Sequence, residues 1–285
     1  AEGAEAEGAA EAEAEGGAGV DLAKLQRQLG VYAGILRQKL GLQVVQIPPS
    51  AGPSAGPSAG PNAGPSRSAL RACVSLEGAA IVQGDTALLT RPRDPDRRRE
   101  ISAVRNVLEE LKLRVVEVTD DSAALDGGDV LFTGREFFVG ISKWTNHRGA
   151  EIVADTFKDF AVSTVPVVGQ CHLKSFCSMG GGDAILIGSS DPARKALKAM
   201  ERLTDHRYEK VSFPRDEAAN CLYARVGANG HFLVHRTFEE FPECSETFQK
   251  LPDYTLIPSA GSEIQALGGT LTSCSILINR KFEPQ

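Results

Sequence analysis

The sequence predicts an α/β protein in which five similar modules close into a ring. Two observations support this prediction. An order of two short strands, a helix and a further strand repeats roughly every 45 to 50 residues, and the two incomplete chain ends complement each other. Hydrophobic residues make up 42% of the 285 positions, which is ample for a buried core. An ordinary mixed α/β sheet is the alternative interpretation of the same pattern.

Residues 1–19 differ from the rest of the chain in composition. Their six glutamates account for the whole net charge of −6, and they contain no Lys or Arg. Without apolar periodicity, this segment is predicted to be a disordered acidic tail that could bind protein partners. The remainder is neutral and has no basic stripe, which argues against nucleic acid as a partner.

The chain shows no sign of export or of a membrane partner. No apolar run approaches the roughly 18 residues of a membrane-spanning helix, and the N-terminus lacks a basic start followed by an apolar region. The cysteines are scattered and are predicted to be reduced thiols. They are Cys73, Cys171, Cys177, Cys221, Cys244 and Cys274. We therefore expect a cytoplasmic protein.

The first element after the tail is an amphipathic helix. Its apolar residues, three and four positions apart, are Leu22, Leu25, Leu29, Tyr32, Leu36 and Leu40. Asp21 is the expected N-cap and Gly41 the C-cap. A strand is predicted at Gln43–Ile47. A tetrapeptide repeat then predicts a Pro/Gly/Ser-rich surface insertion at residues 50–68, inside a single domain that spans residues 20–285.

Four complete modules follow the insertion. Their first strands are predicted at Ala79–Val82, Val130–Phe132, Leu173–Met179 and Cys221–Val226. Their second strands are predicted at Thr86–Thr90, Phe137–Ile141, Ala184–Gly188 and His231–His235. After a helix, the third strands are predicted at Arg114–Val118, Val162–Val167, Lys210–Phe213 and Tyr254–Ile257. A last strand, Leu271–Asn279, would form the fifth module with the N-terminal helix and strand.

Polar residues recur at one point of each module. They are Glu77, Asp126, His172 and Asn220 before the first strands, and the pair Ser273–Cys274 early in the last strand. In a ring, equivalent positions face the same axial end, so these side chains are expected to share one pocket. Taken singly, Asp126 is also typical of a turn, His172 of a satisfied core or surface histidine, and Cys274 of a small buried hydrophobe.

This set of groups suits attack on an electrophilic carbon beside a cation. Carboxylates hold a guanidinium by paired hydrogen bonds, a thiolate is a strong nucleophile, and a histidine can protonate the departing amine. The predicted ligand is a guanidino small molecule, and the chemistry needs no cofactor. A metal site at Cys171, His172 and Cys177 is disfavoured, because adjacent residues rarely ligate one ion.

Residues 125–140 (LDGGDVLFTGREFFVG), Arg148–Phe157, Ala161–Val167 and His172–Met179 resemble the dimethylarginine dimethylaminohydrolase family. The resemblance extends over essentially the whole chain from Val20, apart from the proline tract. It implies a five-bladed α/β propeller of the pentein, or amidinotransferase, superfamily. It also implies hydrolysis of Nω-methylated arginines to citrulline and methylamines, a C–N bond cleavage that regulates nitric oxide synthesis.

The resemblance also assigns roles to residues. It implies His172 as general acid/base, Asp126 as its carboxylate partner, Glu77 on the substrate guanidinium and Arg97 on the substrate carboxylate. We take Cys274 as the candidate nucleophile.

Four positions depart from the family's pattern. Gly78 and Ala72 stand where the family has acidic residues, Trp144 aligns with a carboxylate-binding arginine, and Ser273 aligns with the catalytic cysteine. Adjacent residues of a strand face opposite sides, so Cys274 can replace that cysteine only through a bulge or shift. Two hypotheses follow: a methylarginine hydrolase that uses Cys274, His172 and Asp126, or a protein of this fold that has lost the reaction and binds another guanidino compound or a protein.

Overall fold

Four three-stranded sheets form the framework of the molecule, and all four share the same topology. The computed structural model describes residues 19–47, 67–181, 183–227, 230–251 and 253–279. In each sheet the first two strands are antiparallel and the third is parallel to the second. The predicted tail, except for Gly19, and residues 50–66 of the predicted insertion lie outside the described residues.

The strands fall close to their predicted positions. The first sheet contains β1 (Ala80–Gln83), β2 (Thr86–Leu89) and β3 (Arg114–Glu117). The second contains β4 (Val130–Phe132), β5 (Glu136–Ile141) and β6 (Ala161–Pro166). The third contains β7 (Cys177–Met179), β8 (Ala184–Ile187) and β9 (Glu209–Ser212), and the fourth β10 (Leu222–Val226), β11 (Gly230–Arg236) and β12 (Thr255–Ser259). The prediction of four repeated modules is confirmed.

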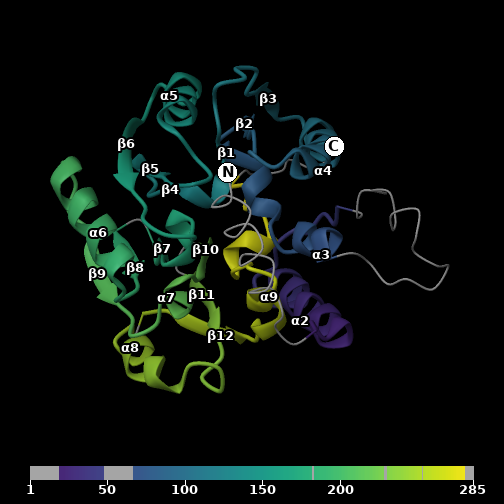
Figure 1. Ribbon diagram of the computed structural model, residues 1–285. Coiled ribbons are helices and arrows are strands. Elements are labelled where there is room, and N and C mark those ends of the chain that lie inside the picture. The colour runs from purple at the N-terminus through teal and green to yellow at the C-terminus, as the bar shows by residue number, and fades with distance from the viewer. Residues whose placement is uncertain (1–18, 48–66, 182, 228–229, 252, 280–285) are drawn as a thin grey trace, which may run out of the picture.

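A helix links the second and third strands of each sheet. These helices are α4 (Pro95–Glu110), α5 (His147–Thr156), α6 (Asp191–Leu203) and α8 (Ser245–Gln249). Figure 1 shows the sheets following one another around the molecule, with these helices towards the outside. Side chains cap two of the helix starts: Asn146 accepts from the backbone N–H of Gly149, and Ser190 from that of Ala193.

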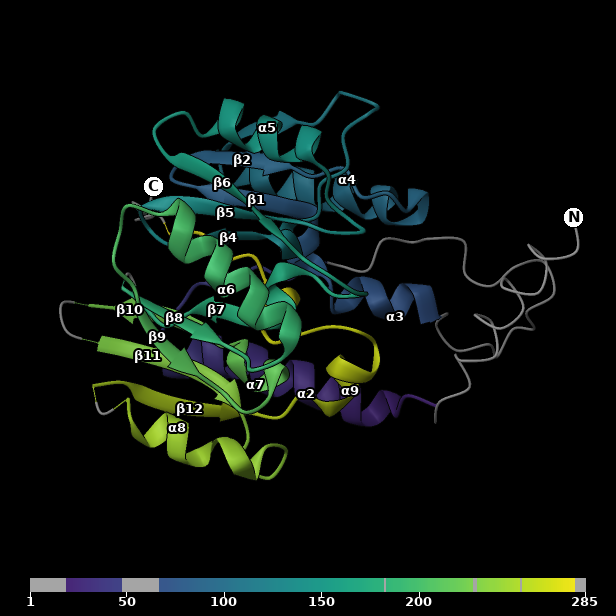
Figure 2. The same cartoon turned by 60° about the vertical axis from the view of Figure 1, so that its left-hand side comes forward.

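The predicted N-terminal helix is confirmed as α2 (Leu22–Gly34), which continues as a π-helical turn, η1 (Ile35–Lys39). Asp21 caps it by accepting from the backbone N–H of Lys24 at 3.0 Å. Gly41 follows with φ +66°, a conformation that favours glycine. In both views of the ribbon, α2 lies beside α9 (Ser262–Ala266), so the first and last described α-helices pack together (Figures 1 and 2).

The two strands predicted for the fifth module are wrong. Residues 43–47 form no strand, and Leu271–Asn279 is replaced by a 3₁₀ turn, η6 (Thr272–Cys274), followed by residues outside any described strand. Apolar side chains of both segments still pack in the core, so burial, not a hydrogen-bond ladder, explains their alternation. The first half of Leu173–Met179 is likewise a 3₁₀ turn, η4 (Leu173–Ser175).

Three short helices were not predicted from the sequence. They are α3 (Arg67–Cys73), α7 (Asp216–Ala219) and α9. Helix α3 begins inside the predicted insertion, whose last residues are therefore helical.

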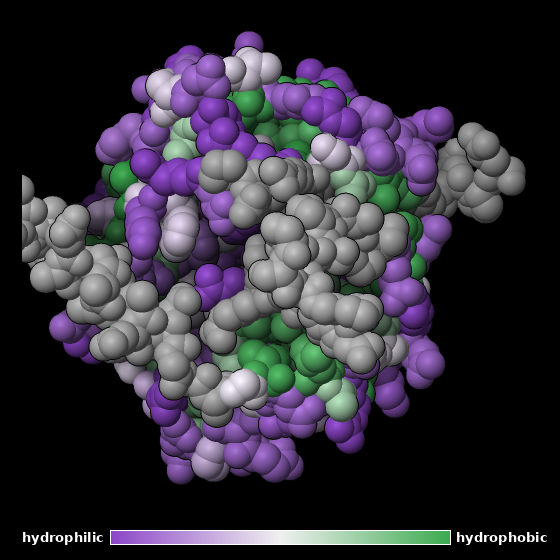
Figure 3. All heavy atoms as spheres, turned by 45° about the vertical axis from the view of Figure 1, so that its right-hand side comes forward, coloured by the Kyte–Doolittle hydropathy of each residue, from purple (hydrophilic) through white to green (hydrophobic). Residues whose placement is uncertain are grey.

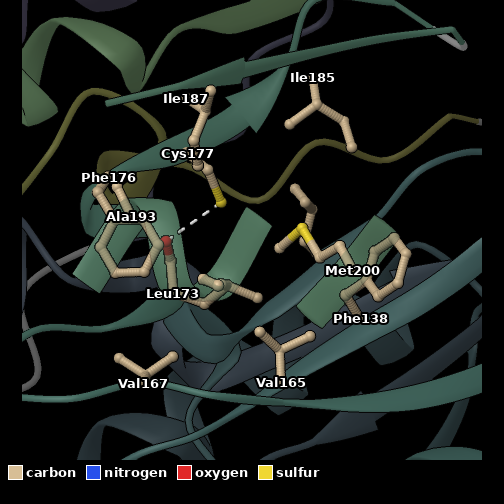
Figure 4. Close-up of a cluster of buried hydrophobic side chains, with 12 residues drawn as sticks. Phe138, Val165, Val167, Leu173, Phe176, Cys177, Ile185, Ile187, Ala193 and Met200 are labelled. Atoms are coloured by element: carbon tan, nitrogen blue, oxygen red, sulfur yellow. Dashed lines mark hydrogen bonds between the residues drawn. The ribbon is translucent and has the colours of Figure 1, made fainter. Parts of the chain in front are cut away.

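Hydrophobic clusters fill the space between neighbouring modules. Figure 4 shows one of them, in which Phe138 and Val165 of the second sheet face Cys177 and Ile185 of the third, with Met200 of α6. The thiol of Cys177 donates to the carbonyl of Leu173 at 3.2 Å. Burial raises the pKa of Cys177 to about 12, so this thiol is structural.

The surface is mixed in character. Figure 3 shows mostly hydrophilic side chains on the face turned towards the viewer, with smaller hydrophobic areas between them. Among the described residues, no helix is both long and apolar enough to span a bilayer. None of the six cysteines, all of which are described, forms a disulfide.

Candidate functional site

Short turns before the sheets hold the residues singled out from the sequence. Glu77 lies in η2 (Leu76–Ala79), Asp126 is the N-cap of η3 (Gly127–Asp129), and His172 is the N-cap of η4. The turn η2 contacts η3 and η6, and η3 contacts η4. The shared position in each module therefore brings these residues to one place, together with Ser273 and Cys274 of η6.

Asp129 is the carboxylate closest to His172. The distance from His172 Nδ1 is 3.3 Å to Asp129 Oδ2 and 3.9 Å to Asp126 Oδ1. Asp129 is fully buried and also accepts hydrogen bonds from Ser142 Oγ, Thr145 Oγ1 and the backbone N–H of Leu173. The family resemblance implied Asp126 as the partner of His172. In the structure Asp129 lies nearer to His172, and its hydrogen bonds to Ser142, Thr145 and Leu173 hold the Asp129 carboxylate in place.

These carboxylates determine the charge of His172. Burial lowers the pKa of His172, but the hydrogen bond to Asp129 and the charges of Asp126 and Asp129 outweigh it, so the pKa is raised. The stabilisation from this imidazolium is fully present below the unfolded-state pKa of about 6.5 and is lost as pH rises through the higher folded-state value. A protonated His172 is suited to general acid catalysis.

Trp144, the only tryptophan in the sequence, reports on this imidazole. Its ring stacks on His172 with centroids 5.5 Å apart and an interplanar angle of 29°. We expect the Trp144 fluorescence to follow the titration of His172, with a midpoint above pH 6.5. Replacing Asp129 with Asn should lower that midpoint by at least about one pH unit, because it removes a charge and weakens a hydrogen bond. Asp121→Asn, at an exposed residue paired with Arg91, is the control; an unchanged midpoint in Asp129→Asn would contradict the assignment.

Glu77 already has a cation bound to it. Its Oε1 is 2.5 Å from Lys174 Nζ, and its Oε2 accepts from Thr272 Oγ1 at 3.0 Å. Asn220 extends this network by donating to Thr272 Oγ1 at 2.9 Å and to the carbonyl of Lys174 at 2.8 Å. The side chains of Glu77 and Lys174 are both mostly buried. Lys174 therefore binds the carboxylate that was expected to hold a substrate guanidinium.

Arg97 lies within the site. Its Nη1 is 2.7 Å from Asp126 Oδ2, and its Nη2 donates to the carbonyl of Ser75 at 3.1 Å. In the sequence-based assignment, Arg97 binds the substrate carboxylate and Asp126 serves His172. In the structure, Arg97 and Asp126 instead form an ion pair with each other.

Neither Ser273 nor Cys274 forms a hydrogen bond with His172 in the described part of the chain. The Ser273 hydroxyl lies against the carbonyls of Val74 and Thr270, and accepts from the backbone N–H of Thr270 at 2.8 Å. The Cys274 thiol donates to the Thr270 carbonyl at 3.4 Å and packs against two hydrophobic clusters. Burial raises the pKa of Cys274 to about 12, which keeps it a neutral thiol. Cys274 is partly buried, and its thiol lies among apolar side chains.

Two residues of the site were missed from the sequence. Nothing in the sequence sets Asp129 and Lys174 apart from other charged residues; only their burial in the structure does. No group of three or more potential metal-binding side chains lies among the residues described. Two surface cavities lie away from this site, one between α6 and β9 and one along α2.

Comparison with known proteins shows the family of the chain. No protein-family model matches the chain. The human protein named "Putative hydrolase DDAH2" is 50% identical over 264 residues, which cover 92% of this chain and 87% of the human one. The chain belongs to the dimethylarginine dimethylaminohydrolase family. The bovine protein of the same name matches to the same extent.

A member from Streptomyces coelicolor named N(G),N(G)-dimethylarginine dimethylaminohydrolase is 36% identical over 104 residues, which cover 36% of this chain and 40% of that protein.

Solved structures show the same fold. The Pseudomonas aeruginosa dimethylarginine dimethylaminohydrolase, solved as a cysteine-to-serine mutant with citrulline, superimposes with a TM-score of 0.70 at 20% identity, over 89% of this chain and 88% of that one. The N-terminal domain of a cyanobacterial arginine dihydrolase, solved with its substrate, gives a TM-score of 0.58 at 16% identity, over 72% and 75% of the two chains. This chain therefore has the dimethylarginine dimethylaminohydrolase fold.

Proposed function

We propose that this protein binds a guanidino small molecule in the site around His172 and has lost the thiol-dependent hydrolysis of methylarginines. The position of Ser273 carries the proposal. Ser273 aligns with the family's catalytic cysteine, and its hydroxyl is engaged by the Val74 and Thr270 backbone instead of by His172. A hydroxyl is a far weaker acid than a thiol and needs a general base to become a nucleophile.

Cys274 does not supply the missing thiolate. With a pKa of about 12, almost all of it is protonated at neutral pH. Its Sγ is directed to the Thr270 carbonyl within an apolar environment, and no base in the described chain accepts its proton.

The remaining groups support binding of a guanidino compound. Glu77 and Asp126 each hold a cation in this structure, Lys174 and Arg97, and Trp144 adds an aromatic face beside His172. The Pseudomonas aeruginosa protein holds citrulline with its cysteine changed to serine. By analogy, a serine in the nucleophile position of this chain is compatible with binding.

Methylarginine hydrolysis by Cys274, His172 and Asp126 is the second candidate. It is favoured by family membership and by the raised pKa of His172, which suits protonation of a departing amine. In this case Glu77 and Arg97 bind the substrate, and the reaction regulates nitric oxide synthesis in the cytoplasm. This candidate requires the Cys274 thiol, which is hydrogen-bonded to the Thr270 carbonyl, to become a thiolate beside a substrate held at His172.

Citrulline release from dimethylarginine distinguishes the two candidates. We expect the purified chain and its Cys274→Ala variant to give equal release, at the level of the His172→Ala variant, because no thiolate faces the imidazole. Saturable turnover that disappears in Cys274→Ala would establish the second candidate instead.

The ring is also proposed to be completed by a fifth blade. The packing of α2 against α9 and the burial of apolar residues from both chain ends support this proposal, as they do that of a single domain over residues 20–285.

A further inference from the structure

The guanidinium of Arg97 fills the space next to Gly78. A Cβ atom at Gly78 would collide with Arg97 Nη2 and lie 2.9 Å from Asp126 Oδ1. Residue 78 is the position at which the family's pattern has a second guanidinium-binding carboxylate. Gly78 has no side chain, and the guanidinium of Arg97 occupies the space that a carboxylate side chain at residue 78 would fill.

Arg97 has a physical reason to bind there. It lies in the first turn of α4, beside Arg98 and Arg99, where the helix dipole disfavours positive charge. Asp126 is 96% buried as a side chain, and a buried carboxylate needs a cation or several donors. The ion pair between Arg97 and Asp126, at 2.7 Å, places the arginine's charge beside an anion and gives the buried carboxylate a cation.

We infer that Arg97 is an internal ligand of the site, whose guanidinium must leave before an external guanidino compound can bind Asp126. The inference rests on the proposed guanidino-binding function and adds that Arg97 limits the affinity for the ligand. In the present arrangement Asp126 and Glu77 are both neutralised from within, by Arg97 and Lys174. A ligand that binds only when Arg97 is displaced has its apparent affinity reduced in proportion to the fraction of chains in that state.

The bound state of Arg97 is incompletely satisfied. Its Nε is buried and lacks a hydrogen-bond partner among the described residues. A buried N–H without an acceptor destabilises the arrangement that contains it. Exchange of Arg97 for a ligand that satisfies all of its donors is therefore physically reasonable.

Agmatine provides a sharp test, because it carries a guanidinium and no carboxylate. Its binding to the full chain can be followed by the fluorescence of Trp144 and by calorimetry. We expect Arg97→Gln to bind agmatine at least about tenfold more tightly than the unmodified chain, since the competing guanidinium is gone. Gly78→Ala should act in the same direction by displacing Arg97 sterically, and serves as a second variant should Arg97→Gln fail to fold. Arg98→Gln, whose arginine donates to the Pro92 carbonyl outside the site, is the matched control and should bind like the unmodified chain.

Three results would overturn the inference. If the unmodified chain binds agmatine and neither folded variant binds it more tightly, Arg97 is not an internal ligand, and the proposed function stands. If Arg97→Gln weakens L-arginine binding and leaves agmatine unaffected, Arg97 contacts only the ligand carboxylate. Absence of agmatine binding in every variant, by both methods, overturns the inference and the proposed function together.

Discussion

The double variant Ser273→Cys/Gly78→Asp is expected to release citrulline from dimethylarginine at least about 10²-fold faster than the unmodified chain. Ser273→Cys introduces the thiol at the position of the family's nucleophile. A thiol also binds the Val74 and Thr270 carbonyls more weakly than the present hydroxyl does, which frees it to approach His172. Gly78→Asp supplies the second guanidinium ligand and leaves Arg97 no room in its present position.

Single variants separate the two contributions. Ser273→Cys alone should gain less, because Arg97 still occupies Asp126. Ser275→Cys is the matched control, since the hydroxyl of Ser275 bonds to Tyr32 and not to the Val74 and Thr270 carbonyls. A double variant no more active than Ser275→Cys would show that the nucleophile position is not at residue 273.

Asp129→Ala is expected to lower the free energy of unfolding by about 3 to 5 kcal/mol. The carboxylate has no solvent exposure and accepts from Ser142, Thr145 and the backbone of Leu173. Its removal leaves three buried donors without acceptors and a cavity beside His172. Urea unfolding followed by circular dichroism at pH 7 measures the loss.

The control for this prediction is Asp121→Ala. Asp121 pairs with Arg91, but its side chain is 96% exposed, and we expect a change of at most about 1 kcal/mol. A difference of less than about 1 kcal/mol between the two variants would contradict a structural role for Asp129.

The modules were predictable because strand and helix patterns are local. Alternating apolar residues, turn glycines such as Gly84 and Gly134 at positive φ, and helix caps each depend on a few neighbouring residues. The repeat then placed Glu77, Asp126 and His172 at equivalent points, and the turns that carry Glu77, Asp126 and His172 do pack together. The two strands predicted for the fifth module were wrong because the alternation at residues 43–47 and 275–279 records burial, and a strand also requires a partner.

The sequence by itself determined the repeated α/β fold, the family and the region of the site. The tertiary structure decided which groups meet: Asp129 on His172, Arg97 on Asp126, and Ser273 on the carbonyl of Val74, 199 residues earlier in the chain. Periodicity follows from local backbone geometry, whereas a hydrogen bond depends on positions within a few tenths of an ångström that only the packed chain fixes. For this protein, that difference separates a recognisable hydrolase site from the proposed one, in which Ser273 and Arg97 take the places of the nucleophile and the substrate guanidinium.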